Sequence, residues 1–260
     1  MQRTRPTLPS RRRLIAMMLG VFLIGIAVGF FRLAELGTDP FTAMNLGVSQ
    51  FLGLDFATYQ VGFNIMLLAV VFFTGRHYIG IGSLFNMVLV GYISTGVIAV
   101  IDALAQTTLF AHPESLPARI SLLIAAVLLA CLGVALYMTA RLGVGPYDAL
   151  ARIVSTATGN RVSFRICRIA TDTLAVVIGG VAYFAAGENV AAIVGVGTLI
   201  MALGTGPLVQ LFIDRIAMPW LGADLAAADS LAAAPIPPSD EEHSTFRPLS
   251  DPPAAATVEE

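Results

Sequence analysis

Six long apolar segments constrain this chain more than any other feature of its sequence. A bilayer core about 30 Å thick needs roughly 20 apolar residues in a helix, and each segment is close to that length. Hydrophobic residues make up 57% of the chain and charged residues 12%, which excludes an ordinary soluble domain. We therefore predict an all-α polytopic membrane protein with six transmembrane helices. The segments are about Leu14–Phe31, Phe56–Thr74, Tyr78–Ile101, Ile120–Ala140, Ile166–Ala186 and Asn189–Ile213.

Two short segments between these runs begin with nearly the same helix breaker. The sequence "LGTDPFT" occupies residues 36–42, and "LGVGPYD" occupies residues 142–148. Each places a glycine three residues before a proline, and an aromatic residue follows the proline directly. The helical segments that follow, Pro40–Phe51 and Pro146–Ala157, have about 12 residues and span only about 18 Å. Because this length cannot cross a bilayer unaided, we predict that each is a short broken or re-entrant helix.

Beyond the breakers, the two halves of the chain share further residues in the same order. An offset of 106 positions aligns residues on both sides of each breaker, and an offset of 115 aligns "GIGSL" with "GVGTL". Coincident helix-breaking residues in the same order are difficult to obtain by chance. We therefore predict two membrane repeats, 14–101 and 119–213, joined by an extracytoplasmic loop at 102–118. The aligned pairs include Arg13 with Arg119, Ser49 with Ser155, Gly53 with Gly159, and Gly80 with Gly195.

Three crossings per repeat make the second repeat inverted relative to the first. With the N-terminus in the cytoplasm, every basic residue except Arg32 and Arg119 then lies inside, as the positive-inside rule requires. If both short helices crossed, the protein would have eight spans and parallel repeats, with Arg32, Arg76 and Arg141 clearly outside. The charge rule separates these two topologies poorly. The length of the short helices favours six spans.

The two ends of the chain differ in charge. Residues 1–13 carry five arginines and no acid, and we predict a basic cytoplasmic N-terminus that leads into a retained signal anchor. Residues 214–260 become rich in alanine and proline, acidic and nearly free of aromatic residues. Such a composition buries too little apolar surface to offset chain entropy. We predict a disordered cytoplasmic tail there.

The breakers supply the first candidate site. Pro40 suits the first turn of a helix, and Asp39 before it can cap the exposed N–H groups. In the second copy Gly145 takes the cap position and Asp148 lies in the first turn. Helix starts of this kind point at anionic groups in many secondary transporters with inverted repeats. The alternative is a tight turn into an interfacial helix, with Asp39 as an ordinary cap.

The fifth span supplies the second candidate site. Arg161, Arg165, Arg168 and Asp172 share one helix face, and Asp172 lies about 16 Å along the helix from Arg161. An acid so deep in a membrane usually faces the bundle interior, where it is paired or lines a polar cavity. Arg168 and Asp172 form either a structural ion pair or a lining that binds substrate or relays a proton. Asn64 of the second span lies at a similar depth in the alignment of the two repeats. The simplest interpretation of Asn64 is a hydrogen bond that packs two helices together.

Catalytic and metal-binding patterns are missing from the sequence. There is no HExxH, GxSxG or GxxxxGK motif. The histidines His77, His112 and His243 lie in two loops and the tail, whereas Cys131 and Cys167 fall inside apolar segments. We expect no enzyme activity, no metal site, no cofactor and no nucleic-acid partner.

The stretch "LGTDPFTAMNLGVSQFLGLDFATYQVGFNIMLL", followed by "GRHYIGIGSLFNMVLVGYI", resembles the YczE/YitT-type group of bacterial integral membrane proteins. The resemblance covers about residues 14–213, although Gly145 replaces the acid of the first breaker. It implies a multi-pass protein of the bacterial plasma (inner) membrane, for which we expect both termini in the cytoplasm.

Two functions remain open at this stage. The first is a small secondary transporter or permease-like protein of unknown substrate, which would bind a small anionic or polar solute. Its candidate substrate-binding residues are Asp39, Pro40, Asn64, Gly145, Asp148, Arg168 and Asp172. The second is a non-transporting membrane factor that supports or regulates another protein. The lipid bilayer is the expected environment in both cases, and a homo-oligomer is left open.

Overall fold

The computed structural model describes residues 10–106, 115–159, 161–162 and 164–233, and all regular structure within these ranges is helical. Six helical stretches are long and apolar enough to cross a membrane, which confirms the predicted number. The long helices are α1 (Arg11–Ala34), α3 (Phe56–Gly75), α4 (Ile81–Gln106), α5 (Leu116–Thr139), α7 (Phe164–Ala185) and α8 (Val196–Phe212). Four of the six stretches lie within single helices, one continues from α3 into the short turn η1 (Arg76–Tyr78), and the sixth runs from the short turn η2 (Val190–Ala192) to Ser230.

Two short helices, α2 (Pro40–Leu52) and α6 (Pro146–Ala157), begin at the prolines of the two breakers, as predicted. In α2 the Asp39 side chain accepts a hydrogen bond from the Thr42 amide at 3.0 Å, which confirms its capping role. In α6 the cap position belongs to Gly145, which has no side chain to offer, and Asp148 lies in the first turn. The short turn η1 links α3 to α4.

The two breakers share an uncommon backbone conformation. In each, a residue other than glycine adopts a positive φ, 51° at Glu35 and 52° at Arg141. Glycines with positive φ follow in both copies, and all the pairs are 106 positions apart. Since L-residues rarely adopt this conformation, its recurrence reflects a repeated local fold rather than a shared composition. The glycine pairs are Gly37 with Gly143 and Gly53 with Gly159.

Each breaker is docked on the start of the last long helix of the other half. The Gly82 amide donates to the Leu142 carbonyl at 2.8 Å, and the Gly197 amide donates to the Leu36 carbonyl at 2.7 Å. These two hydrogen bonds join equivalent positions at the offsets of 106 and 115. A second pair of hydrogen bonds is also equivalent in the two halves. The Val144 amide donates to the Tyr78 carbonyl, and the Thr38 amide donates to the Ile193 carbonyl.

Glycine is required at these docking points because backbone meets backbone. A Cβ added at Gly80 would lie 2.2 Å from the Leu142 carbonyl oxygen, and one at Gly195 would lie 2.6 Å from that of Leu36. Both distances are shorter than real Cβ contacts allow. The glycines of "GIGSL" and "GVGTL" are therefore needed for the close backbone contact between the two halves.

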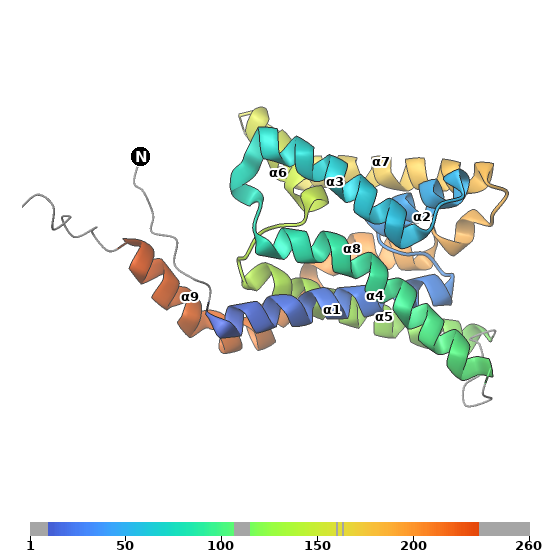
Figure 1. The fold of residues 1–260 in the computed structure, drawn as a ribbon, viewed down its shortest axis with the longest axis horizontal. Helices are drawn as coiled ribbons and strands as arrows, with labels where there is room; N and C mark the ends of the chain where they lie inside the picture. The colour runs from blue at the N-terminus through green and yellow to red at the C-terminus, as the bar shows by residue number, and fades with distance from the viewer. Residues whose placement is uncertain (1–9, 107–114, 160, 163, 234–260) are drawn as a thin grey trace, which may run out of the picture.

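The repeat-equivalent helices α1 and α5 pack against each other in antiparallel fashion (Figure 1). Near the start of α1, the Arg13 side chain donates to the Ala140 carbonyl just after α5, at 2.9 Å. Beyond the end of α1, Glu35 forms an ion pair of 3.1 Å with Arg119 near the start of α5. Between these ends Gly20 and Gly133 let the two backbones approach closely.

The chain stays helical beyond α8, which corrects the predicted disorder from residue 214. A π-helical turn, η3 (Ile213–Ala217), leads into α9 (Met218–Ala233), which projects from one end of the bundle (Figure 1). Leu221 and Leu225 are buried in the same core cluster as Met17 of α1. These two leucines are four residues apart and so share one helix face, a pattern that average composition hides. Residues 234–260 and 1–9 lie outside the described residues.

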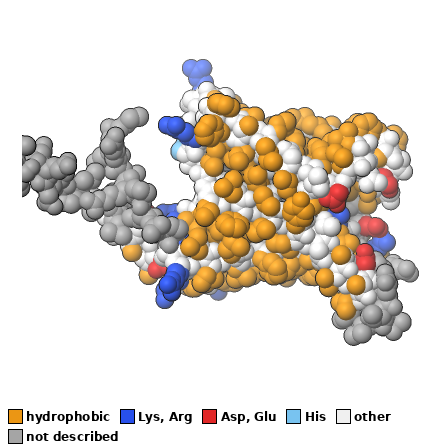
Figure 2. Space-filling model, viewed as in Figure 1, with side chains coloured by type: hydrophobic (Ala, Val, Ile, Leu, Met, Phe, Trp, Pro, Cys, Tyr) orange, Lys and Arg blue, Asp and Glu red, His pale blue; other side chains and the backbone are white. Residues whose placement is uncertain are grey.

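The surface of the bundle matches a membrane environment. Hydrophobic side chains cover the middle of the visible face (Figure 2). Basic side chains gather at the end where α1 begins, and acidic side chains with a few basic ones gather at the opposite end (Figure 2). Large apolar residues on the long helices point outward, with Phe73 of α3 85% exposed and Leu203 of α8 80% exposed. An apolar exterior on helices of this length identifies an integral membrane protein.

Candidate functional site

The first turns of the two short helices meet inside the bundle. The aromatic rings of Phe41 and Tyr147, which directly follow the two breaker prolines, stack with centroids 4.6 Å apart. These residues are equivalent at the offset of 106, so each breaker contacts its own counterpart. Apolar side chains from α2, α3 and α7 surround the pair. They include Met44, Phe63, Leu67 and Ala175.

A cluster of charged side chains lies against this aromatic pair, and we call it the central cluster: Tyr147, Asp148, Arg168 and Asp172. Arg168 Nε lies 3.0 Å from Asp172 Oδ2, which confirms the ion pair predicted one turn apart on α7. The Tyr147 hydroxyl donates to Asp172 Oδ1 at 2.7 Å. The Arg168 guanidinium also lies over the Tyr147 ring, 5.0 Å from its centroid.

Asp148 brings the second breaker into the same ion-pair system. Its carboxylate pairs with the Arg168 guanidinium, which therefore bridges the carboxylates of α6 and α7. A Cβ at Gly145 would lie 3.1 Å from Asp148 Oδ2 and 3.7 Å from Asn86 Oδ1. The glycine that departs from the first breaker pattern thus leaves room for the Asp148 carboxylate in a narrow space between α4 and α6.

The first breaker contributes Asp39, whose carboxylate caps α2 and also accepts from the Thr38 hydroxyl at 3.4 Å. Asp39 lies in the link between the first two spans. Burial raises the pKa of its carboxyl above the usual value, and the charge of Asp172 raises it further. Pro40 is buried at the first position of α2. Both breakers therefore place an acid beside a helix N-terminus close to the central cluster.

The structure brings together most, but not all, of the predicted site residues. Asn64 is buried in α3, one residue after Phe63, yet no hydrogen bond or ion pair among the described residues joins it to the central cluster. Arg161 is exposed at the other end of the predicted polar face. The side chain of Arg165 lies outside the described residues.

Sequence reasoning missed Tyr147 as a site residue, although the signal was present. An aromatic residue follows the proline in both breakers, and the pattern alone does not show that the two rings meet. Burial raises the pKa of the Tyr147 phenol, which lies outside the six spans, so the hydroxyl stays protonated and donates to Asp172.

A cavity of about 320 Å³ lies beside α2, and its wall includes Thr38 of the first breaker. The rest of the wall comes from α1, α2 and α7, from the segment around the start of α3, and from the link before α8. None of its lining residues belongs to the second breaker. Within the part of the chain that the structure describes, no three His, Cys, Asp or Glu side chains are grouped to hold a metal ion.

Comparisons with known proteins point to one family. A protein-family model described as "Family of unknown function (DUF6198)" matches residues 11–214, which include both repeats. A protein of Haemophilus influenzae described as "Uncharacterized protein" is 27% identical over 201 residues, covering 75% of this chain and 80% of that protein. No solved structure gives a significant match.

Proposed function

The chain belongs to DUF6198, a family of unknown function, and we propose that this membrane protein is a small secondary transporter or permease-like protein. One observation carries the proposal. The N-terminal turns of two broken helices meet at an ion cluster inside a six-helix bundle, at Phe41, Tyr147 and Arg168. Half-helices that begin inside the membrane and face charged groups are the arrangement in which many secondary transporters bind their substrates.

We also infer that the two repeats are inverted in the membrane. The support is the antiparallel packing of α1 and α5, which occupy equivalent positions in the two halves. A two-fold axis that relates two antiparallel helices is perpendicular to both of them. If α1 and α5 cross the bilayer, this axis lies in the membrane plane, as in inverted-repeat transporters.

The central cluster narrows the chemistry of the solute. Asp39 and Asp148 already place carboxylates at the positive ends of α2 and α6. Asp148 and Asp172 alone outnumber the single guanidinium of Arg168, and burial, which raises the pKa of Asp39, favours a proton on that carboxyl. We infer that a proton or a polar solute with a positive charge binds here in preference to the anionic solute that the helix starts alone predict.

The alternative function is a non-transporting membrane factor. One observation favours it, because the stacked rings of Phe41 and Tyr147 fill the place where the breakers converge. A packed centre is compatible with a purely structural role for the two breakers. On resemblance, we further infer a relationship to YczE/YitT-type proteins, a location in the bacterial plasma membrane and cytoplasmic termini.

The six-span topology predicts opposite accessibility for two exposed residues, His77 after α3 and Glu188 after α7. We expect single cysteines at these positions, in a protein with Cys131→Ala and Cys167→Ala, to react with a membrane-impermeant maleimide from opposite sides. His77→Cys should react from the cytoplasmic side and Glu188→Cys from outside. Eight spans would place both outside, so labelling from one side only contradicts the inverted arrangement.

If a solute binds at the central cluster, it should raise the unfolding temperature of the protein, and one conservative substitution in the cluster should remove this increase. We expect one or more small cationic or polar solutes in a screen to raise the unfolding temperature of the purified protein. A solute at a hundred times its dissociation constant adds about 2.7 kcal/mol to the free energy of unfolding. Asp172→Asn should leave an inserted, folded protein without this response.

The matched control for the screen is Arg141→Gln. Arg141 forms an exposed ion pair with Asp229 of α9, 3.3 Å long, and among the described residues no hydrogen bond or ion pair joins either side chain to the central cluster. This variant should respond to the solute as the wild type does. If Asp172→Asn responds equally well, the solute does not bind at the central cluster.

A further inference from the structure

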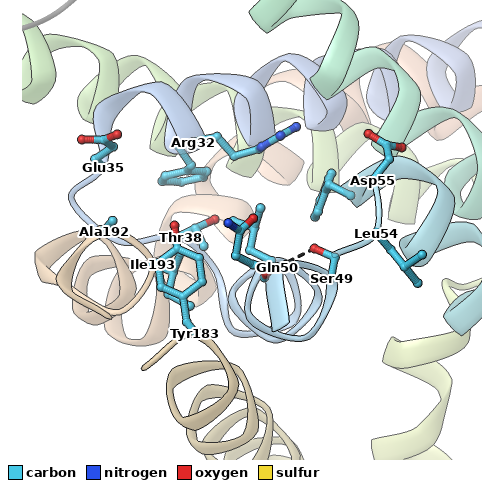
Figure 3. A pocket seen from close by; sticks show the side chains of 13 residues that line it. Arg32, Glu35, Thr38, Ser49, Gln50, Leu54, Asp55, Tyr183, Ala192 and Ile193 are labelled. Carbon is cyan, nitrogen blue, oxygen red and sulfur yellow. Dashed lines mark hydrogen bonds between the residues drawn. The ribbon is translucent and has the colours of Figure 1, made fainter. Parts of the chain in front are cut away.

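The cavity beside α2 is polar, although it lies between helices of a membrane protein. Its volume is about 320 Å³, within the size that holds a small molecule. Figure 3 shows Arg32, from the last turn of α1, and Asp55, from the link before α3, directed toward the same space. Gln50 of α2 and Tyr183 of α7 complete its walls.

Arg32 is held in place by the protein itself. Its Nη1 donates to the Ser94 hydroxyl at 3.1 Å and to the Thr95 hydroxyl at 3.4 Å, both on α4. The guanidinium also lies over the Phe56 ring, 4.6 Å from its centroid. Both hydrogen bonds use one nitrogen of a group with five N–H donors. The protein therefore fixes the orientation of the guanidinium, and its remaining N–H donors are available to a ligand.

Asp55 is held in place from its own side of the cavity. Its Oδ2 accepts from the Thr58 amide at 2.9 Å and from the Thr58 hydroxyl at 3.1 Å, as the cap of α3. Among the described residues, no ion pair joins Asp55 to Arg32. Glu35, the other acid of the wall, pairs with Arg119 at 3.1 Å. The cavity therefore presents one positive and one negative group that attract each other across it without a direct ion pair.

The second repeat shows that this charge pair is not a requirement of the fold. At the offset of 106, Arg32 corresponds to Met138 and Asp55 corresponds to Arg161. The breaker backbone and the docking hydrogen bonds recur in both halves without these two charges. The two charges are therefore particular to the first half, where Asp55 caps α3 and Arg32 bonds to α4, and each keeps hydrogen-bonding capacity that a ligand could use.

We propose that this cavity binds a small zwitterion, with the anionic group of the ligand on Arg32 and its ammonium group at Asp55. A simple anion would meet the Asp55 carboxylate, and a simple cation would meet the Arg32 guanidinium, so a ligand with both charges is the best match. Two sources supply this chemistry, a free zwitterionic solute and the headgroup of a zwitterionic phospholipid. The site is separate from the central cluster and does not depend on transport.

Phosphoethanolamine tests the proposal, with methyl phosphate and ethanolamine as probes that carry charge of one sign only. Calorimetry on the purified full-length protein in maltoside detergent measures the dissociation constants. We expect phosphoethanolamine to bind about tenfold or more tightly than either of these two probes, because it alone meets both charged groups; tenfold corresponds to about 1.4 kcal/mol. Equal affinity for phosphoethanolamine and methyl phosphate, or no binding of phosphoethanolamine, overturns the proposal.

Two variants separate the charges. Asp55→Asn should keep the α3 cap, because asparagine caps as well as aspartate, yet remove the preference for phosphoethanolamine over methyl phosphate. Arg32→Gln should weaken binding of phosphoethanolamine and methyl phosphate about tenfold or more. Arg141→Gln, at an exposed ion pair, should bind like the wild type. If Arg32→Gln does not fold, Asp55→Asn still decides, since a mere structural defect would not change the selectivity between two probes.

Nanodiscs distinguish the two sources of the ligand. In discs of phosphatidylglycerol, phosphoethanolamine should bind as in detergent. If the lipid headgroup occupies the cavity, discs rich in phosphatidylethanolamine should abolish phosphoethanolamine binding by competition. If a free solute is the ligand, binding should be unchanged between the two lipids. Either result supports the zwitterion site and assigns its source, whereas wild-type affinity in both Arg32→Gln and Asp55→Asn contradicts it.

Discussion

Replacing Arg168 by glutamine should lower the free energy of unfolding by about 3 kcal/mol or more, since it leaves carboxylates without their cation. Arg168 pairs with both Asp148 and Asp172, and the side chains of Arg168, Asp148 and Asp172 are 33%, 47% and 25% exposed, so the set is partly buried. Removing one member of a buried ion pair costs more than removing the whole set, because the remaining charge must stay desolvated. Chemical unfolding in detergent, followed by tryptophan fluorescence or circular dichroism, measures the loss.

The control for this prediction removes the carboxylates together with the guanidinium. From the sequence alone, the double variant Arg168→Gln with Asp172→Asn would recover most of the stability. The structure adds Asp148, so the double variant still strands one carboxylate. We expect substantial recovery only in the triple variant that also carries Asp148→Asn. An Arg168→Gln protein as stable as the wild type contradicts a structural role for the cluster.

Arg168→Lys refines the test because it keeps the charge and loses the fork of donors. Lysine can neutralise one carboxylate at a time, whereas the guanidinium meets Asp148 and Asp172 through two different nitrogens. We expect its stability to fall between those of the wild type and Arg168→Gln. Stability equal to the wild type would show that charge alone matters in the cluster.

Local sequence patterns predicted much of the fold because their causes are local. The six long helices follow from apolar length, and the two short helices begin at Pro40 and Pro146, since a proline is best accommodated in the first turn of a helix. The Arg168–Asp172 pair follows from one turn of helix spacing. Each of these predictions depends on residues that are close together in the chain.

The parts of the site that were missed depend on contacts between distant segments. Asp148 and Arg168 are 20 residues apart on different helices, and no periodicity shows that they meet. The predicted disorder was wrong for residues 214–233 for a related reason, since Leu221 is buried in the same core cluster as residues near the start of α1. Composition measures the average polarity of a segment, but a helix needs only one apolar face to dock.

The contact between α2 and α7 leads to the other prediction with a large expected effect. A Cβ added at Gly47 of α2 would lie 2.0 Å from the Gly179 carbonyl oxygen of α7, and one at Gly179 would lie 2.5 Å from the Ala43 carbonyl oxygen. The atoms in the way are backbone, which cannot rotate aside as a side chain does. Gly47→Ala must therefore move the two helices apart.

We expect Gly47→Ala to lower the free energy of unfolding by about 3 kcal/mol, at the upper end of what overpacking costs. The gain in helix propensity from glycine to alanine, about 1 kcal/mol, opposes the loss and is too small to cancel it. Gly62→Ala in α3 is the matched control, since a Cβ there meets nothing within 4 Å. That variant should be as stable as the wild type or slightly more stable.

The same displacement reaches the candidate site, because α2 begins at Asp39 and Pro40 while α7 carries Arg168 and Asp172. Moving α2 away from α7 should loosen the Phe41–Tyr147 stack and with it the hydrogen bond from Tyr147 to Asp172. Gly47→Ala should therefore weaken any solute response of the central cluster, although residue 47 touches none of its members. Equal unfolding temperatures for Gly47→Ala and Gly62→Ala would show that the helices separate at no cost, and that the close contact does not hold the site together.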